Sequence, residues 1–275
     1  MKKSTSHKLN FCYPEGFLAG FAHAGLKKQK PDVALFYSET PAACAAVFTK
    51  NAMKGNHIPF CASQLAKSKN TVRAVLVASG NANAFNGPDG IEALEGIKRA
   101  YSRQLGIGAM QFLILQTGKI GMHFDGKPVI RIAKKLSCNL AKGGLGPVEA
   151  IMTTDSWPKA FAAEVKLSSG IVRLGGVCKG AGMICPNMAT MLALVSTDAK
   201  IAHADLSAML ASAVSVSFNS ISVDNDTSPN DTVLLLANGA SGVQIRKGTK
   251  DYEKFLAALS GICTIIPIPP CRSKT

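Results

Sequence analysis

The segment 179–192 reads Lys-Gly-Ala-Gly-Met-Ile-Cys-Pro-Asn-Met-Ala-Thr-Met-Leu and is the most informative stretch of this 275-residue chain. It starts as a glycine-rich loop, passes through Pro186 and Asn187, and ends in an apolar run. This pattern predicts a turn that leads into a buried strand or helix. Thr190 stands out, because a hydroxyl within an apolar run needs a hydrogen-bond partner when it is buried.

Two further segments place hydroxyl groups where a site could form. Thr117 and Gly118 follow the apolar run 112–115, which predicts a buried strand that ends at these two residues. A hydroxyl and a freed backbone N–H at a strand end can face one oxygen atom. The segment 152–159, Met-Thr-Thr-Asp-Ser-Trp-Pro-Lys, is by itself typical of a capping or turn segment.

The rest of the chain alternates between strand and helix patterns. Helices are predicted at 91–105, with Gly106 as the stop, and at 206–218. Residues 125–150 are expected to form a loop, a helix and a glycine-rich turn. Strands are predicted at 74–78, 112–115, 172–177, 221–223 and 233–236. This alternation predicts a mixed α/β fold.

The composition is that of a globular protein with a core, since 47% of residues are hydrophobic and 17% are charged. The formal net charge of +14 first suggests a nucleic-acid partner. However, the lysines are scattered in small groups, and aromatic residues make up only 6%. We therefore expect no nucleic-acid binding, and a basic surface that attracts small carboxylate substrates.

The eight cysteines contain no C-x-x-C pair, and the spacing of Cys178 and Cys185 matches no common zinc or redox motif. Free cysteines in the core predict a reducing, cytoplasmic compartment. The polar residues after the N-terminal Met-Lys-Lys do not resemble a signal peptide, and no apolar run is long enough to span a membrane. We expect no membrane association.

Common site signatures are not met. A phosphate-binding loop would need Ser or Thr in place of Ile120, and a calcium loop starting at Asp224 would need glycine in place of Pro229. A polar turn between two strands explains the segment 224–228 better. The five histidines lack metal-ligand spacing, and no G-x-S-x-G elbow is present. No metal site is predicted.

The segment 179–192 is very similar to the self-cleavage segment of the ornithine acetyltransferase family, whose members are bifunctional glutamate N-acetyltransferases. Other pieces match this family in the same order, so that the resemblance covers about residues 14 to 258. They are Gly16-Phe17 with Ala19-Gly20, and the segments 41–43, 47–49, 79–84, 117–121, 152–155 and 218–232.

The resemblance implies a layered α/β sandwich of the self-cleaving ornithine acetyltransferase type. It implies cleavage between Ala189 and Thr190, which gives an alpha chain 1–189 and a beta chain 190–275. Two alpha and two beta chains would form a heterotetramer. The implied role is in arginine biosynthesis, where acetyl moves from N2-acetylornithine to glutamate through an acetyl-threonine at Thr190. No cofactor is implied, and acetyl-CoA remains open as a co-substrate.

The resemblance also implies roles for other residues. Thr117 and Gly118 would form the oxyanion hole, and Thr153, Lys179 and Thr190 would contact the substrate. The chemistry is reasonable, because cleavage frees an α-amine on the nucleophile itself, and such an amine has a pKa near ~7.7–8.0. For Lys179 the alternative is an exposed lysine at the start of a loop. Whether Thr153 or Thr154 makes the contact is open.

The chain departs from the family pattern at some positions. Phe85 stands where a small residue or cysteine is usual, and Lys119 where an aliphatic residue is usual. From about Ser260 the expected helix and Gly-Glu-Gly-Ala-Thr-Lys segment are replaced by a tail with three prolines, which exclude a helix there. We expect a truncation or frameshift that leaves the sandwich incomplete. The alternatives are an inactive remnant, a non-catalytic assembly subunit, or a related self-cleaving amidase.

Overall fold

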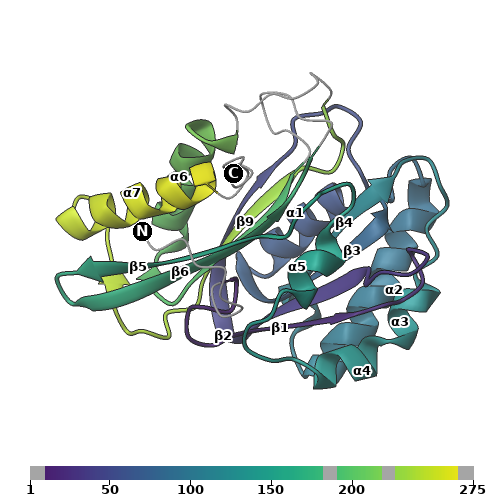
Figure 1. Ribbon diagram of the computed structural model, residues 1–275, viewed down its shortest axis with the longest axis horizontal. Coiled ribbons are helices and arrows are strands. Elements are labelled where there is room, and N and C mark those ends of the chain that lie inside the picture. Colours follow the sequence, from purple (N-terminus) through teal and green to yellow (C-terminus); the bar gives the residue numbers. More distant parts are fainter. Residues whose placement is uncertain (1–9, 182–190, 219–226, 266–275) are drawn as a thin grey trace, which may run out of the picture.

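The computed structural model describes residues 10–181, 191–218 and 227–265 of the chain. Its main element is an eight-stranded sheet, in which β1 (Phe17–Ala22) pairs with β2 outside the linear strand order (Figure 1). In that order the strands are β4 (Phe112–Lys119), β3 (Thr71–Asn81), β2 (Val33–Phe48), β9 (Thr232–Ala237), β7 (Leu192–Thr197), β6 (Gly170–Lys179) and β5 (Lys159–Leu167).

The long strand β2 joins the two halves of the sheet. Its first part pairs antiparallel with β1 and β3, and its second part, from Ala43 to Phe48, pairs antiparallel with β9. The pairing with β3 is irregular between Tyr37 and Ala42. Strand β2 is therefore the link between β1 and β3 on one side of the strand order and β9 on the other.

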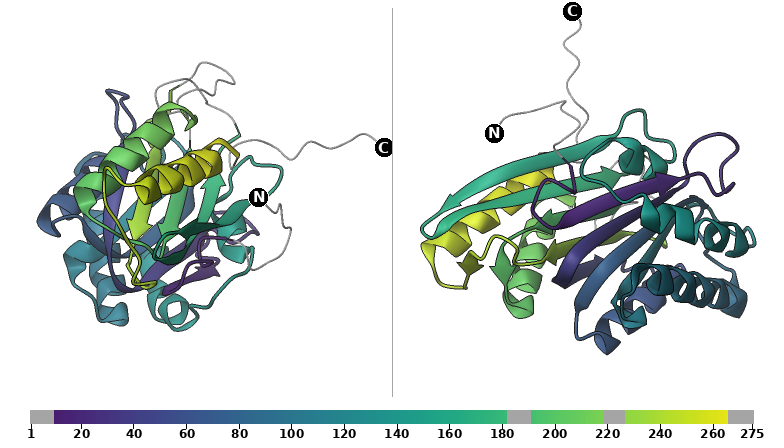
Figure 2. Two further views of the ribbon diagram at one scale, coloured as in Figure 1. Left: turned by 90° about the vertical axis from the view of Figure 1, so that its left-hand side faces the viewer. Right: turned by 90° about the horizontal axis from the view of Figure 1, so that it is seen from below.

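Helices cover the sheet at two places (Figures 1 and 2). Helices α1 and α2 pack on β4, and α3 and α4 pack on α2, whereas α6 and α7 pack against each other beside β2 and β5. The helices are α1 (His57–Lys67), α2 (Gly87–Leu105), α3 (Lys127–Arg131), α4 (Ala133–Cys138), α5 (Gly146–Ile151), α6 (His203–Ser215) and α7 (Lys250–Ile265). A short 3-10 turn (Ala109–Gln111) precedes β4, and β8 (Lys200–Ile201) pairs with β10 (Gln244–Ile245).

The central strands are buried on both faces. Leu192 and Leu194 of β7 belong to the core that also holds β1 to β4, while Ala193 and Val195 pack on the opposite side with α6 and α7. Successive side chains of a strand point to opposite faces, so a continuous apolar run is what such a strand needs. The result is an α/β sandwich, as expected from the sequence.

Most predicted elements are confirmed. Strands lie at 74–78, 112–115, 172–177 and 233–236, and α2 ends at Gly106, which takes the left-handed conformation with φ of 63°. The predicted strand 221–223 lies outside the described residues.

Four boundaries differ from the prediction. Strand β4 does not end at Thr117 but runs to Lys119, because Gly118 still pairs with Gly80 of β3. The predicted turn around Gly146 is the start of α5, where proline at the second position is favourable. Helix α6 ends at Ser215 rather than at 218. Helix α7 continues through Ser260 to Ile265, ahead of the prolines, which lie outside the described residues.

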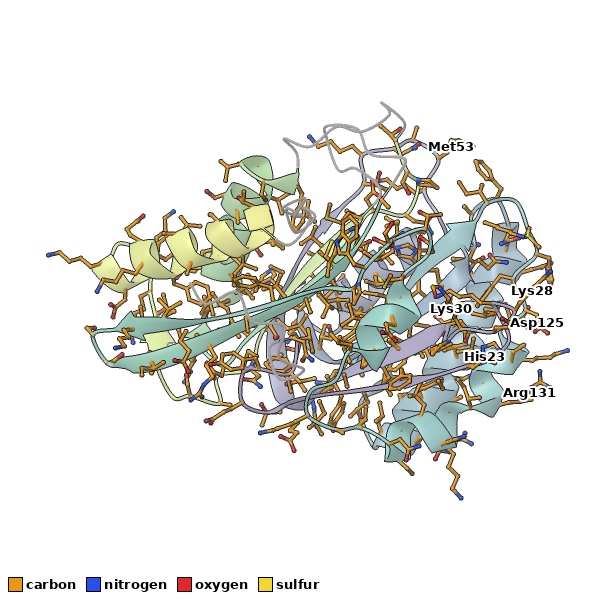
Figure 3. All side chains as sticks on the ribbon, viewed as in Figure 1. His23, Lys28, Lys30, Met53, Asp125 and Arg131 are labelled. Atoms are coloured by element: carbon orange, nitrogen blue, oxygen red, sulfur yellow. The ribbon has the colours of Figure 1, made fainter. Side chains whose placement is uncertain are left out.

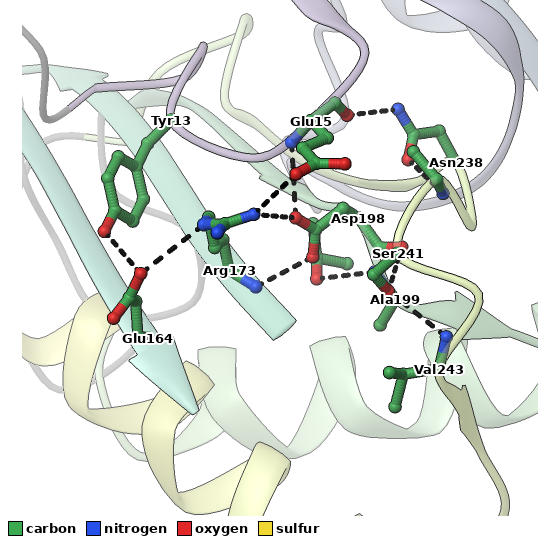
Figure 4. A network of polar contacts seen from close by, with 11 residues as sticks. Tyr13, Glu15, Glu164, Arg173, Asp198, Ala199, Asn238, Ser241 and Val243 are labelled. Atoms are coloured by element: carbon green, nitrogen blue, oxygen red, sulfur yellow. Dashed lines mark hydrogen bonds and ion pairs between the residues drawn. The ribbon is translucent and has the colours of Figure 1, made fainter. Parts of the chain in front are cut away.

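A buried carboxylate ties the N-terminal segment to the second half of the sheet (Figure 4). Asp198 accepts hydrogen bonds from the backbone N–H groups of Arg173, at 2.8 Å, and Glu15, at 3.2 Å. The Arg173 guanidinium adds ion pairs to Glu15 at 3.0 Å and Glu164 at 3.4 Å. Both oxygens of Asp198 are therefore satisfied, as a buried carboxylate requires.

The described cysteines are free and mostly buried. Burial raises the pKa of Cys178 to about 12, so this thiol is neutral and behaves as a small core residue. In the described part of the chain, no helix is long and apolar enough to cross a bilayer.

Candidate active site

A cavity of about 530 Å³ opens where the ends of β3, β4 and β6 meet the three loops that carry Lys27, Thr153 and Asn230. The described residues that line it include three lysines and no acidic side chain. They are Lys27, Gly80, Ala82, Thr117, Gly118, Lys119, Ile120, Thr153, Thr154, Lys179, Ala181, Ser228, Pro229 and Asn230. Such a lining suits an anionic ligand.

Lys179 joins two of the predicted site residues across the cavity wall. It is the last residue of β6 and is only 2% exposed, so the alternative of an exposed loop lysine is wrong. Its Nζ donates hydrogen bonds to the hydroxyls of Thr117, at 2.8 Å, and Thr153, at 3.3 Å. Burial lowers the pKa of Lys179, and the nearby carboxyls of Asp155 and Asp231 oppose this shift.

The Lys179 contact also orients the Thr117 hydroxyl. An ammonium group has three donors and no acceptor, so the Thr117 oxygen must accept the hydrogen bond. The hydroxyl proton of Thr117 then remains available to another acceptor. Since Thr117 lines the cavity, an oxygen atom bound there can receive it.

Gly118 is required by the close approach of β3 and β4. Its φ is 137°, and an added Cβ would overlap the Gly80 carbonyl and lie 2.5 Å from the backbone nitrogen of Asn81. The close packing of β3 and β4 therefore explains why position 118 is a glycine. Its part in the oxyanion hole remains a prediction.

A buried ion pair holds the backbone just after Lys179. The Lys159 ammonium lies 2.7 Å from Asp155 Oδ1, which also accepts the Gly180 N–H at 2.8 Å. Lys159 donates to the Gly180 carbonyl as well. Burial alone would raise the pKa of Asp155, but the hydrogen bonds from Lys159 and Gly180 outweigh it and lower the pKa. This pair was not predicted from the sequence, although opposite charges four residues apart were a signal.

Lys27 supports the loop that carries Thr153. The Asp32 carboxylate accepts the N–H groups of residues 24, 25 and 27 and so shapes the turn. Lys27 Nζ then reaches inward to the carbonyls of Ala150, at 3.1 Å, and Met152, at 2.6 Å. Burial lowers the pKa of Lys27 to about 8. By contrast, its neighbours His23, Lys28 and Lys30 are exposed (labelled in Figure 3).

The segment before β9 closes the cavity from the other side. Asn230 Nδ2 donates to the carbonyls of Ala82, at 2.6 Å, and Gln116, at 2.8 Å. Asp231 Oδ1 accepts the N–H of Met191 at 2.9 Å, and the Met191 carbonyl accepts the N–H of the next residue, 232, at 3.0 Å. These contacts, too, were not predicted.

The predicted nucleophile Thr190 and its neighbour Ala189 lie outside the described residues. The residues that flank this segment are described. Ala181 lines the cavity, and Met191 is held by residues 231 and 232 at the entry to β7. The structure thus brings Thr117, Thr153 and Lys179 together, while the roles of all predicted site residues remain predictions.

Comparison with known proteins identifies the relatives. A model of the ArgJ family matches residues 18–267, most of the chain. The chain belongs to the ArgJ family. It is 39% identical over 258 residues to the arginine biosynthesis bifunctional protein ArgJ of Chlorobaculum tepidum. The match covers 92% of this ArgJ-family chain but 63% of that relative, so the chain spans about three-fifths of the relative's length.

Solved structures agree with the ArgJ assignment. The ornithine acetyltransferase of Mycobacterium tuberculosis, solved in complex with ornithine, aligns with a TM-score of 0.60 and 27% identity and covers 68% of this chain and 98% of its own. The l-aminopeptidase d-Ala-esterase/amidase of Ochrobactrum anthropi, a variant of the Ntn hydrolase fold, aligns with a TM-score of 0.57, covering 96% of this chain and 87% of its own. At 10% identity, this second likeness shows the fold alone.

Proposed function

We propose that this ArgJ-family chain carries the acyl-transfer centre of an arginine-biosynthesis enzyme, in which Thr190 takes acetyl from N2-acetylornithine and passes it to glutamate. The observation that carries the proposal is the buried Lys179 ammonium, which bridges the hydroxyls of Thr117 and Thr153 beside the cavity. It combines a cation for a substrate carboxylate with a hydroxyl whose proton is free to bind an oxyanion.

The first reaction is self-cleavage. The Thr190 hydroxyl oxygen adds to the Ala189 carbonyl carbon, and the C–N bond breaks as the proton passes to the Thr190 nitrogen. Water then hydrolyses the resulting ester, which leaves a carboxylate on Ala189 and a free α-amine on Thr190. This amine is the base that a threonine nucleophile otherwise lacks.

The second reaction is acetyl transfer. The Thr190 oxygen attacks the acetyl carbonyl of N2-acetylornithine, and ornithine leaves with the hydroxyl proton. The amine of glutamate then attacks the acetyl ester, and the Thr190 oxygen recovers a proton. The chemistry needs no cofactor. Acetyl-CoA would enter the same scheme as a thioester donor.

The same oxyanion donors serve both reactions, because each passes through a tetrahedral intermediate. We assign this task to the Thr117 hydroxyl and the Gly118 N–H. Replacing Thr117 by Val, which keeps the shape but removes the donor, should slow cleavage by about 10²- to 10³-fold. A time course on freshly translated protein measures this, and an unchanged rate would reduce Thr117 to a structural residue.

Both proposed substrates carry a carboxylate, which fits a cavity lined by three lysines and no described acid. Lys179 uses two of its protons on Thr117 and Thr153, which leaves one for the substrate. We infer that Lys179 and Thr153 hold this carboxylate, with Thr154 as the neighbouring alternative.

The two cleavage products, 1–189 and 190–275, are proposed to stay together and to pair as two alpha and two beta chains. Strands β7 and β9 of the second product lie between β6 and β2 of the first. A location in the cytoplasm is our expectation, in keeping with the free described cysteines.

Intact-mass spectrometry of the purified chain tests the proposal. Wild type should yield two fragments, Thr190→Ala should remain one chain of 28.8 kDa, and the matched control Thr190→Ser should still cleave. Ornithine release from N2-acetylornithine should then depend on glutamate. Cleavage that persists in Thr190→Ala would overturn the nucleophile, and glutamate-independent release would indicate an amidase instead.

A further inference from the structure

Asp231 precedes β9 and has a buried carboxyl group. Of its two oxygens, only one accepts a hydrogen bond from a described residue. The residue is 1% exposed, and its Oδ1 accepts the Met191 N–H at 2.9 Å. Its Oδ2 is buried and has no partner within hydrogen-bonding distance among the described residues. The Ser228 hydroxyl lies nearby and favours the ionised form, as does the charge of Lys179, the charged group that faces this carboxyl.

Such a carboxyl is costly to bury. Burial raises the pKa of Asp231 to about 8, against the opposing effects of Met191, Ser228 and Lys179. An apolar residue would fill the space without an unpartnered oxygen, but it could not accept the Met191 N–H. A residue that costs stability in a buried position beside a cavity is a candidate for a functional role.

The contacts of Met191 show what Asp231 holds. Both backbone polar groups of Met191 are bound by residues 231 and 232, because the Thr232 N–H also donates to the Met191 carbonyl at 3.0 Å. Asp231 is itself anchored, since its carbonyl accepts the Thr49 N–H at 2.9 Å. Met191 directly follows the predicted nucleophile Thr190 in the sequence, so the fixed amide is that of the neighbouring residue.

We propose that Asp231 is a positioning residue for the nucleophile: its carboxyl fixes the backbone amide of Met191, the residue that directly follows Thr190 in the sequence. The inference rests on the proposed function of Thr190. A nucleophile must lie within a fraction of an ångström of its working position, and a loss of such positioning costs on the order of 10²-fold in rate. Asp231 acts through Met191 and does not touch the reacting atoms.

The test compares two replacements of Asp231. Asp231→Asn keeps an oxygen that accepts the Met191 N–H, whereas Asp231→Leu keeps the approximate volume without an acceptor. We expect self-cleavage within about threefold of wild type for Asn and slower by roughly 10²-fold for Leu. The matched control is Asp198→Leu, which removes another buried carboxylate that accepts backbone N–H groups and is not among the residues that line the cavity.

Rates are taken per folded molecule, from intact mass and circular dichroism on the same samples. Hydroxylamine is added in a parallel reaction, because it traps the ester at Ala189 and so reports ester formation separately from hydrolysis. Hydroxamate yield should fall in Asp231→Leu and stay normal in Asp198→Leu. A merely structural role would lower the folded fraction in both variants and leave the rate per folded molecule unchanged.

Three outcomes would overturn the inference: wild-type cleavage in Asp231→Leu, an Asn variant as slow as the Leu variant, or equal slowing by Asp198→Leu. If Asp231→Leu does not fold, Asp231→Ser replaces it, since its hydroxyl stays polar but is too short to reach Met191. Failure of the proposed function is recognised independently, because Thr190→Ala would then still cleave whatever the Asp231 variants do.

Discussion

At the scale of single residues, three groups in or beside the cavity are in states that cost stability or that favour glycine. Lys179 is a lysine with a lowered pKa, Asp231 is an aspartate with a raised one, and Gly118 has a φ that other residues rarely adopt. Burial of an ionisable side chain costs stability, and strongly shifted pKa values are common at functional sites. Asp231 and Gly118 each yield a prediction about stability.

The raised pKa of Asp231 predicts a pH-dependent stability. The folded-state pKa is about 8, against 3.8 for the free side chain, so the folded state keeps a proton that the unfolded state releases. The contribution of the protonated carboxyl to the free energy of unfolding is fully present below pH 4 and is lost as pH rises towards 8. Asp231→Asn should therefore gain stability relative to wild type from pH 4 to pH 8 and level off above.

Denaturant unfolding of both proteins, in a Thr190→Ala background that prevents cleavage, measures this difference. A difference that is independent of pH would show that Asp231 is ionised in the folded state near neutral pH.

Gly118→Ala should unfold or strongly destabilise the protein. The added Cβ would lie 2.5 Å from the Asn81 nitrogen, so β3 and β4 would have to move apart. In addition, residue 118 has a φ of 137°, which is unfavourable for alanine. A cost of about 3 kcal/mol or more in the free energy of unfolding is expected. The control is Gly121→Ala, at a φ of 75° with no atom within 4 Å, where about 1 kcal/mol is expected. Equal losses in the two variants would contradict the steric argument.

At the scale of elements, the site depends on where loops are pinned to strand ends. Lys27 holds the carbonyls before Thr153, and the Asp155–Lys159 pair holds the peptide after Lys179. These side chains can affect the site without contacting a ligand. They keep the hydroxyl of Thr153 and the ammonium of Lys179 in contact.

Breaking the Asp155–Lys159 pair should cost far more than breaking an exposed pair. Asp155→Ala leaves the buried Lys159 ammonium without its partner, which is expected to lower the free energy of unfolding by about 3–5 kcal/mol. Glu164→Ala, which removes a half-exposed partner of Arg173, should cost less than about 1 kcal/mol. Thermal or denaturant unfolding of the two variants decides the matter, and similar losses would show that the Asp155 pair is not a structural anchor.

At the scale of the whole molecule, the predicted cleavage point separates strands that remain neighbours. Strands β7 and β9 are inserted between β6 and β2, and side chains such as Leu194 and Leu234 belong to the core of β1 to β4. The predicted cleavage would therefore divide the chain but not the core, because strands of both fragments lie in the same sheet. One folded unit can be made of two chains without loss of its core.

Fragments 1–189 and 190–275 should consequently co-elute in gel filtration and separate only in denaturant. Burial of the apolar side chains of β7 and β9 in the shared sheet supplies the binding energy. Native gel filtration followed by denaturing electrophoresis of each fraction measures this, with uncleaved Thr190→Ala as the size reference. Separation of the fragments in native buffer would contradict the shared sheet.

The sequence by itself determined the elements and the family. Continuous apolar runs at 74–78, 112–115 and 233–236 predicted strands buried on both faces, and Gly106 marked the end of α2, because these signals are local. Tertiary structure alone decided that Lys179 is buried against Thr117, 62 residues away, and that Asp231 binds Met191, 40 residues away. The burial of these side chains, and the pKa shifts that it causes, depend on contacts between segments that are distant in the sequence. Local sequence patterns do not predict such contacts.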